Sequence, residues 1–449
     1  MIKMKTVFLP VARPTFDVET ANIYFEQSKQ LLNKLVDCSI SPDALLMSPE
    51  DTARFIRDAV QGGPVDAVIV QSTTFVDARF IIEIMDATDA PILLWGVREP
   101  RVNGTRLSLN SMTGINNLSN SIVARRRKFA LLFGNPQEAE LAAELHAQLK
   151  VVRLMQQLKQ LKIGVIGSQP DGFLFSHADP DMLAKLGPQL IELNLQDVFA
   201  KAAEVPEQEV QLALQTAAGQ VKGLSLLPEE GVVKFSRFQT ALLHEIRRLG
   251  ISMVAVRCWP EFFTEYGAAA CSTVSSLIES GVMASCEADI HGAITMYIQH
   301  QLAQNAPYLG DLVHIDESKD SGVFWHCGAG AFSLARADTG AVAGLHPNRK
   351  LGFTLEFGLK AGEVSVNRLG PDPFKPGAYR MLMLSGEALD EPQKFWGTSV
   401  EVGFGQPIVP LMKKLMLQGF EPHYSIVYAN INKEVGMLCD WLDVEKNPL

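Results

Sequence analysis

The sequence predicts an α/β fold: two Rossmann-like doubly wound domains followed by an antiparallel β-barrel-like C-terminal domain. Short apolar runs alternate with segments of helical periodicity through the first two thirds of the chain, and this cycle begins again after a long helical stretch. After Pro307, glycine and β-branched residues rise and apolar residues alternate with a period of two. The chain has 449 residues, enough for several domains, and we predict domains at 1–160, 161–306 and 307–449.

In the first predicted domain, each apolar run is bounded by turn residues or followed by a helical pattern. Strands are predicted at Thr6–Leu9, Ala67–Gln71, Pro91–Trp95 and Phe129–Phe133. Val18–Val36 has apolar residues at helical spacing, and Pro136–Gln160 is a long helix with proline at its favoured first position. Strands and helices in alternation indicate a parallel sheet with helices on both faces.

The second predicted domain repeats this cycle and carries the carboxylates considered below. Strands are predicted at Lys162–Gly167, Gly223–Leu227 and Ser252–Cys258. Helices are predicted at Val232–Leu249, Cys271–Glu279 and Ala288–Gln304. The alternation again indicates a doubly wound sheet.

The third predicted domain is rich in strands. These are expected at Gly322–Leu334, Leu351–Phe357, Glu363–Leu369, Tyr379–Ser385 and His423–Ala429. Two helices are expected near the end of the chain, at Pro407–Leu417 and Lys433–Leu442. Such a run of strands separated by turn residues is typical of an antiparallel barrel or sandwich.

Composition excludes several classes of partner. The net charge of −10 argues against nucleic acid, because neutralising phosphates requires clustered Lys and Arg. No apolar run approaches the roughly 20 residues that span a bilayer, so no membrane partner is expected. The first residues read as a strand and not as a signal peptide, and the six scattered cysteines form no CxxC pair. We therefore predict a cytoplasmic protein with reduced cysteines.

Glu261 stands just past the predicted strand that ends at Cys258. Ligands of doubly wound folds bind at the carboxyl ends of such strands, which makes Glu261 a candidate site residue. The alternative is a glutamate placed favourably at a helix N-terminus after Pro260.

Glu287 and Asp289 flank Ala288 at the start of a predicted helix. Helix capping alone would explain them, with Asp289 as the N-cap. However, the run that precedes them is apolar, and buried carboxylates need a partner, for which a cation is one candidate. His326 and His423 could each be a ligand, a substrate contact or a packed histidine. Carboxylates with an imidazole suit hard or borderline divalent cations.

Five separated segments resemble, in the same order, segments of the L-fucose/L-arabinose isomerase superfamily. They are Val11–Asp17, Cys258–Glu261, Cys286–Met296, Trp325–Gly328 and Pro422–Tyr424. The resemblance covers all three predicted domains and implies the same fold. This sequence departs from the superfamily at the last segment, where Pro-His replaces a His-His pair.

The resemblance assigns roles to individual residues. It implies a metal ion, with Mn²⁺ expected, bound by Glu261, Asp289 and His423, with Glu287 as the alternative to Asp289. Glu261 and Asp289 would also be the catalytic residues. Arg13, Trp325 and His326 would bind the substrate. The superfamily further implies a homo-oligomer whose active site is shared between subunits, with Arg13 reaching a neighbour's substrate.

The expected function is that of a metal-dependent aldose–ketose isomerase of carbohydrate metabolism. It would act on a small monosaccharide through a cis-enediol intermediate, with the cation stabilising the charge that develops on the sugar oxygens. Two alternatives remain at this stage. One is a sugar-binding or catalytically divergent member, and the other is a sugar epimerase or aldolase using the same metal site. The sequence does not decide whether the sugar is neutral, deoxygenated, phosphorylated or sulfonated.

Overall fold

The computed structural model describes residues 1–449, and the chain divides into two compact units, Met1–Gln156 and Gln157–Leu449. Helix α5 (Ala139–Gln160) crosses this division. The predicted boundaries at 160/161 and 306/307 stay predictions. The second of them lies inside the second unit, between a parallel sheet and a strand-rich part.

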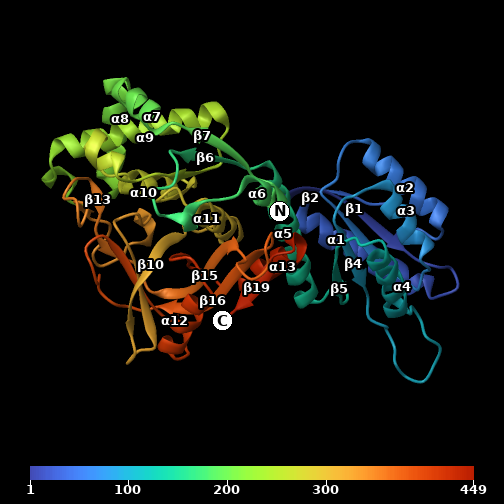
Figure 1. Cartoon of the computed structure of the whole chain (residues 1–449). Coiled ribbons are helices and arrows are strands. Elements are labelled where there is room, and N and C mark those ends of the chain that lie inside the picture. The colour runs from blue at the N-terminus through green and yellow to red at the C-terminus, as the bar shows by residue number, and fades with distance from the viewer. The chain divides into compact units, whose positions relative to one another are not determined.

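The first unit is a parallel sheet in the order β2-β1-β3-β4-β5, with helices on both faces (Figure 1). Its strands are β1 (Ile2–Val11), β2 (Val36–Ile40), β3 (Ala67–Ser72), β4 (Ile92–Gly96) and β5 (Phe129–Phe133). Its helices are α1 (Val18–Leu35), α2 (Pro49–Gln61), α3 (Arg79–Ala87) and α4 (Ser111–Ala124). Strand β2 was missed because it follows α1 directly, with no turn residue to signal the change from helix to strand.

The second unit contains a smaller parallel sheet in the order β7-β6-β8-β9. Its strands are β6 (Lys162–Ile166), β7 (Gln189–Leu193), β8 (Met253–Val256) and β9 (Met283–Ser285). Its helices are α6 (Pro180–Leu186), α7 (Leu195–Ala203), α8 (Glu207–Gln220), α9 (Glu229–Leu249), α10 (Cys271–Glu279) and α11 (Ile290–Ala303). The prediction of parallel α/β sheets is confirmed in both units.

One predicted strand of this sheet was wrong. Gly223–Leu227 instead forms a turn with a short 3₁₀ segment, Leu224–Leu226. Gly223 has a left-handed backbone (φ 77°), and the side chain of Leu226 is 85% exposed. The run therefore forms a turn that buries Leu224, exposes Leu226 and does not enter the sheet.

The remainder of the second unit is a separate mixed sheet in the order β14-β17-β11-β10-β18-β15-β16-β19. Its strands are β10 (Tyr308–Asp316), β11 (Ser321–His326), β14 (Phe357–Gly358), β15 (Gly362–Pro371), β16 (Tyr379–Ala388), β17 (Thr398–Gly403), β18 (His423–Val427) and β19 (Glu445–Pro448). The strands β12 (Ala343–Gly344) and β13 (Thr354–Leu355) form a separate pair, and the helices are α12 (Ile408–Leu417) and α13 (Asn432–Leu442).

The predicted antiparallel arrangement of this third part holds for most strand pairs but not for all. Strands β14 and β19 pair in parallel, with β17 and β16 respectively, so the sheet is mixed. An additional pairing joins β16 to β17. The barrel-like form stays a prediction.

Helix α11 connects the two sheets of the second unit, because it packs on β8 and β9 and also on β15 and β18 (Figure 1). Its polar residues bond to the strand-rich side: Thr295 Oγ1 accepts from the N–H of Leu369 (3.0 Å), and Gln299 donates to Asn367 Oδ1 (2.9 Å). Although α11 is apolar on most faces, neither it nor any other helix combines the length and apolar content needed to cross a membrane.

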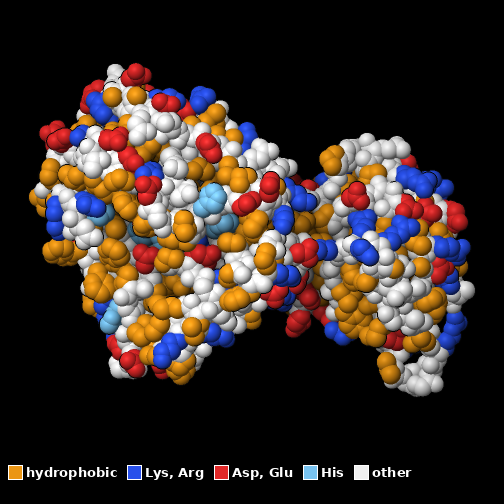
Figure 2. All heavy atoms as spheres, viewed as in Figure 1, with side chains coloured by type: hydrophobic (Ala, Val, Ile, Leu, Met, Phe, Trp, Pro, Cys, Tyr) orange, Lys and Arg blue, Asp and Glu red, His pale blue; other side chains and the backbone are white.

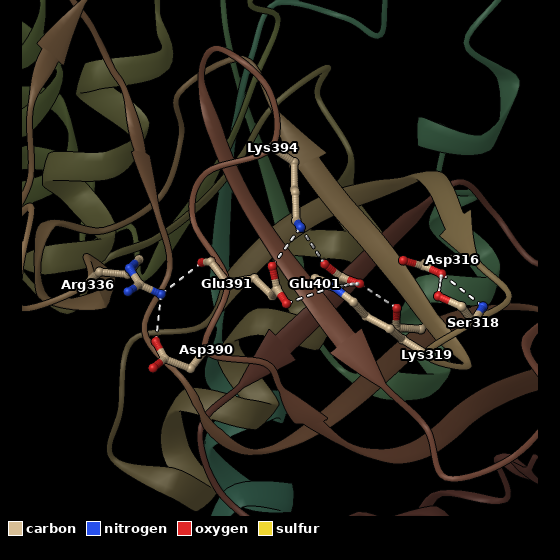
Figure 3. Close-up of polar contacts among 9 residues, drawn as sticks. Asp316, Ser318, Lys319, Arg336, Asp390, Glu391, Lys394 and Glu401 are labelled. Atoms are coloured by element: carbon tan, nitrogen blue, oxygen red, sulfur yellow. Dashed lines mark hydrogen bonds and ion pairs between the residues drawn. The ribbon is translucent and has the colours of Figure 1, made fainter.

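A charged network lies along β17 of the mixed sheet (Figure 3). The carboxylate of Glu401, on β17, is only 2% exposed. It accepts from Ser321 Oγ (2.6 Å) and pairs with Lys394 (2.9 Å), which also binds Glu391 (2.9 Å). Figure 3 shows Lys394 reaching between the two carboxylates. This network ties the loop before β17 to the sheet.

Candidate functional site

In the first unit, Arg13 follows β1 at the point where the strand order reverses between β1 and β3. Its N–H donates to Thr74 Oγ1 (2.8 Å), which fixes the backbone at this edge. Its guanidinium pairs with Asp77 and lies 5.3 Å from the ring centroid of Phe75. Arg13 therefore stands at the usual ligand-binding edge of such a sheet, with its charge already partnered.

In the second unit, completely buried His423 lies at the start of β18, where three strands align polar residues. Asp311 of β10 is the direct register partner of both His423 and Trp325. The Nδ1 of His423 lies 2.8 Å from Asp289 Oδ2. On the other side of the ring, Nε2 lies 3.3 Å from Glu287 Oε2 and 3.7 Å from Asp311 Oδ1. Although burial lowers the pKa of His423, its carboxylate partners raise it to about 10.

Asp289 is buried completely and is fully occupied by protein partners. It is the N-cap of α11 and accepts the N–H of Gly292 on Oδ1 (2.9 Å). Both of its oxygens also accept from Arg368, which is itself completely buried. Burial raises the pKa of Asp289, but the charge of Arg368 and the bond to His423 outweigh it and hold the pKa well below its usual range. Asp289 is thus a permanent anion that orients the imidazole.

Gly292 is required for this arrangement. A Cβ at this position would lie 2.4 Å from Asp289 Oδ2 and 3.1 Å from Arg368 Nη1. Any larger residue would push the carboxylate and the guanidinium away from their bonding positions.

Glu287 reaches the opposite side of the His423 ring because the backbone turns sharply before α11. Glu287 and Ala288 both have left-handed backbones, with φ of 57° and 51°. The turn is held where the N–H of Ala288 donates to the carbonyl of Val256 (3.0 Å) at the end of β8. Non-glycine residues in this conformation cost about 1–3 kcal/mol each and cluster at functional sites.

Glu261 lies at the carboxyl end of β8, as predicted, but its direct partner is Arg257 (2.7 Å) and not His423. Both residues line a cavity of about 720 Å³ at the ends of β6, β7 and β8. Arg257 also donates to the carbonyl of Gln169 (2.7 Å) in the loop after β6. The hydrogen bond from Arg257 lowers the pKa of Glu261, so this carboxylate is ionised at neutral pH.

His326 and Glu287 line a second cavity, of about 250 Å³. The N–H of Cys327 donates to His326 Nδ1 (2.9 Å), and burial lowers the pKa of His326 to about 4, so the neutral ring carries its proton on Nε2. That buried Nε2 has no hydrogen-bond partner. Figure 2 shows histidine and acidic side chains at the surface near the middle of the second unit.

Trp325 lines a different cavity, with Phe395 and Trp396, because neighbouring residues of a strand point to opposite faces. Its Nε1 donates to the carbonyl of Trp396 (2.6 Å). The structure therefore brings together Asp289, His423 and Glu287, with His326 close by at a ring-centroid distance of 5.6 Å from His423. Glu261 and Trp325 make no hydrogen bond or ion pair with Asp289, His423 or Glu287.

The predicted metal can be tested against the donor atoms. No three His, Cys, Asp or Glu side chains are grouped as a metal site in the structure. The nearest arrangement surrounds His423 Nε2, which is buried and has no hydrogen-bond partner. Two ligands at right angles on one small divalent cation lie roughly 3 Å apart. The separations of 3.3 and 3.7 Å from Nε2 to Glu287 and Asp311 are longer than this value, so the donors are of the right kind but are not closed around an ion.

Three charged residues of this site were missed by the sequence analysis. Asp311 is opposite His423 only because of strand register, and burial raises its pKa to about 6. Arg368 comes from the middle of β15, and Glu421 lies 3.6 Å from its Nε. Glu421 directly precedes the Pro-His pair in the sequence. This proximity to His423 was the one signal that could have identified Glu421 as a site residue.

No family model matches the chain. Curated relatives match almost its full length, and each is named sulfoquinovose isomerase. The protein of Alkalicoccus urumqiensis is 46% identical, covering 96% of both chains. That of Priestia megaterium is 44% identical over 98% of both, and that of Clostridium sp. (strain MSTE9) 36% identical over 99% of both. Among solved structures, a solute-binding protein from Agrobacterium vitis covers 67% of this chain and 90% of its own, at 13% identity and a TM-score of 0.18, which is too low for argument.

These relatives, together with the polar site described above, define an isomerase that interconverts an aldose and a ketose sugar. The prediction of such an enzyme is confirmed. More narrowly, the chain belongs to the sulfoquinovose isomerase family.

Proposed function

We propose that this enzyme converts sulfoquinovose, a sugar that carries a sulfonate, into the corresponding ketose. The names of the relatives supply the substrate, and one structural observation supports the chemistry. A cavity of about 250 Å³, suited to one monosaccharide, is lined by Glu287 and by His326, whose buried Nε2–H has no partner. The two residues offer a base and a hydrogen-bond donor at one cavity.

The reaction moves one proton from C2 to C1 of the open sugar and another from O2 to O1, through a cis-enediol. Glu287 is the proposed base for the C–H proton. Burial raises its pKa, but the nearby charge of His423 outweighs this and lowers it, so Glu287 is ionised. The Nε2–H of His326 donates to a sugar oxygen, the partner it lacks in the structure. A positioned acid or base contributes roughly 10²–10⁴-fold to the rate.

The proposed cofactor is Mn²⁺, held by His423 Nε2 with Glu287 and Asp311. When bound, it would supply a Lewis acid that polarises the sugar oxygens. In the protein, Asp289 accepts from His423 Nδ1 and so leaves Nε2 as the ligand atom, an arrangement common among metal-binding histidines. Asp289 thus becomes the orienting group, and Glu287, the alternative named from the sequence, takes its place as ligand.

Glu261 remains a proposed catalytic residue and ligand. Its ionised carboxylate lines the neighbouring cavity, and its use at the sugar requires that it leave Arg257. Arg13 and Trp325 remain proposed substrate contacts. We also retain the L-fucose/L-arabinose isomerase superfamily, its barrel-like C-terminal domain and its shared active site in a homo-oligomer as proposals, which would give Arg13 a role beside a neighbour's substrate.

Isomerisation in D₂O, followed by NMR, tests this function. Purified enzyme is treated with a chelator, dialysed, and assayed on sulfoquinovose with and without added Mn²⁺. The expected result is a ketose product with deuterium at C1, formed only when Mn²⁺ is restored. Deuterium at C2 without a ketose would indicate an epimerase, and shorter carbon fragments would indicate an aldolase. Full activity after complete metal removal would overturn the metal assignment.

A further inference from the structure

Two kinds of side chain line the 250 Å³ cavity. His326 is buried, and Glu287 is half-buried. Asn348 and Arg349 are both exposed. Under the proposed function, C1 and C2 of the sugar react at Glu287. A sulfonate carried at the far end of the sugar needs its own binding group on the lining, and the exposed residues offer one.

A sulfonate is ionised at every physiological pH and needs a cation that no carboxylate has already neutralised. Two arginines that contact carboxylates of the site fail this condition. Arg257 pairs with Glu261 at 2.7 Å, and Arg368 pairs with Asp289. Arg349 meets the condition: its guanidinium has no carboxylate within ion-pair distance, and its one ring contact is with Phe263, at 5.7 Å from the centroid.

The backbone around Arg349 is a closed turn that is anchored to the cavity wall. The N–H groups of Asn348 and Arg349 both donate to His346 Nδ1, at 3.3 and 3.2 Å. The N–H of Lys350 returns to the carbonyl of His346 (2.9 Å). The His346 ring packs edge-on against Phe263, with centroids 4.9 Å apart. The turn therefore fixes the start of the Arg349 side chain and leaves its charged end available.

We propose that Arg349 is the specificity-determining residue that binds the anionic sulfonate of the substrate. This rests on the proposed function, because it takes the reacting end of the sugar to lie at Glu287. Arg349 pairs with the sulfonate oxygens through its planar N–H groups, while Asn348 supplies an amide beside it. Neutral sugars of the same shape gain nothing from this contact.

The test compares two substrates in wild type and in matched variants. Wild type, Arg349→Gln and the matched control Lys350→Gln are assayed on sulfoquinovose and on the same sugar with hydrogen in place of the sulfonate. Lys350 is the adjacent exposed cation, and it lies over the Trp396 ring (4.2 Å to the centroid) and not in the cavity. Arg349→Gln is expected to raise the KM for the sulfonated sugar by roughly 10- to 100-fold, the usual effect of a charge-assisted hydrogen bond. Its kcat, and its kcat/KM on the neutral sugar, stay near wild type.

Lys350→Gln should change neither substrate's constants, and Arg349→Lys should restore part of the affinity. An equal loss on both sugars in Arg349→Gln would overturn the proposal, because it would indicate a structural role. Loss of discrimination in Arg13→Gln but not in Arg349→Gln would also overturn it. Calorimetric binding of sulfoquinovose separates this inference from the proposed function. If wild type binds the sugar without converting it, the function fails, whereas weaker binding to Arg349→Gln still supports the role of Arg349.

Discussion

His423 Nδ1 lies 2.8 Å from Asp289 Oδ2, and Arg368 holds the same carboxylate from the other side. All three side chains are completely buried. Asp289 therefore has no oxygen left to face a substrate, whereas Glu287, two residues earlier, lines the cavity. Asp289 therefore orients the imidazole, whereas Glu287 is the proposed base. Mutations of the two residues should separate these roles.

Glu287→Gln should lower kcat by at least about 10²-fold, because it removes the proposed base without changing side-chain size. Stability should fall less than in the Asp289 variant below, because the Glu287 carboxylate is 19% exposed and Asp289 remains as the counter-ion of His423. Steady-state kinetics and thermal unfolding check both parts. Wild-type kcat in a folded Glu287→Gln protein would remove Glu287 from the mechanism.

Asp289→Asn should instead destabilise the second unit. The substitution leaves Arg368 without its buried counter-ion, and breaking such a pair costs about 3–5 kcal/mol. Loss of activity should accompany a clear fall in Tm. An Asp289→Asn protein that unfolds at the wild-type temperature would contradict this structural role of Asp289.

Gly292→Ala should disturb the same group from the backbone side. Because the added methyl would lie 2.4 Å from Asp289 Oδ2, we expect a loss of about 1–3 kcal/mol and lower activity. Gly436→Ala in α13 is the matched control, since there the nearest atom is 3.5 Å away and alanine favours the helix. Equal behaviour of the two variants in thermal unfolding would refute the packing argument.

Glu401→Ala should weaken the strand-rich part of the second unit. It removes the nearly buried carboxylate that Ser321 and Lys394 share, and we expect a cost of about 1–3 kcal/mol. Asp390→Ala is the control, because Asp390 is 80% exposed in its pair with Arg336 and should contribute at most about 1 kcal/mol. Chemical denaturation of both variants gives the comparison, and a cost for Asp390→Ala as large as that for Glu401→Ala would contradict it.

Asp77 should make the stability of the first unit depend on pH. Its hydrogen bonds with Arg79, assisted by the charge of Arg13, lower its pKa from 3.8 to about 2. Since the folded pKa lies below the unfolded one, the carboxylate stabilises the fold above pH 3.8, and this contribution is lost as pH falls through about 2. Asp77→Asn should therefore be less stable than wild type at pH 7, with a smaller difference at pH 3. A stability difference between wild type and Asp77→Asn that stays constant from pH 7 to pH 3 would contradict this prediction.

The sequence predicted those features that depend on local pattern. The parallel sheets followed from apolar runs and helical spacing, and Asp289 was recognised as a helix N-cap, which it is. Strand β2 was hidden because no turn residue separates it from α1, and Gly223–Leu227 misled because an apolar run can also form an exposed turn.

The arrangement of the site depended on long-range pairing, which a single sequence does not reveal. Asp311 meets His423 through strand register across two antiparallel strands. Arg368 reaches Asp289 from a strand 79 residues later in the chain. Neither residue belongs to a motif, so only the folded chain identifies them. Glu287 was named as the alternative to Asp289, and the left-handed backbone that directs it towards His423 was not visible in its sequence context.

Helix α11 begins at the site and packs on strands of both sheets of the second unit. Asp289 caps the N-terminus of this helix, but the partners of Asp289 come from β15 and β18, which are synthesised much later. A nascent chain that has emerged from the ribosome only as far as the end of α11 would lack the partners of Asp289. It would therefore expose this carboxylate and the apolar faces of the helix. The enzyme's reactive centre is therefore completed late in biosynthesis, and chains truncated before β18 should be inactive and prone to aggregate.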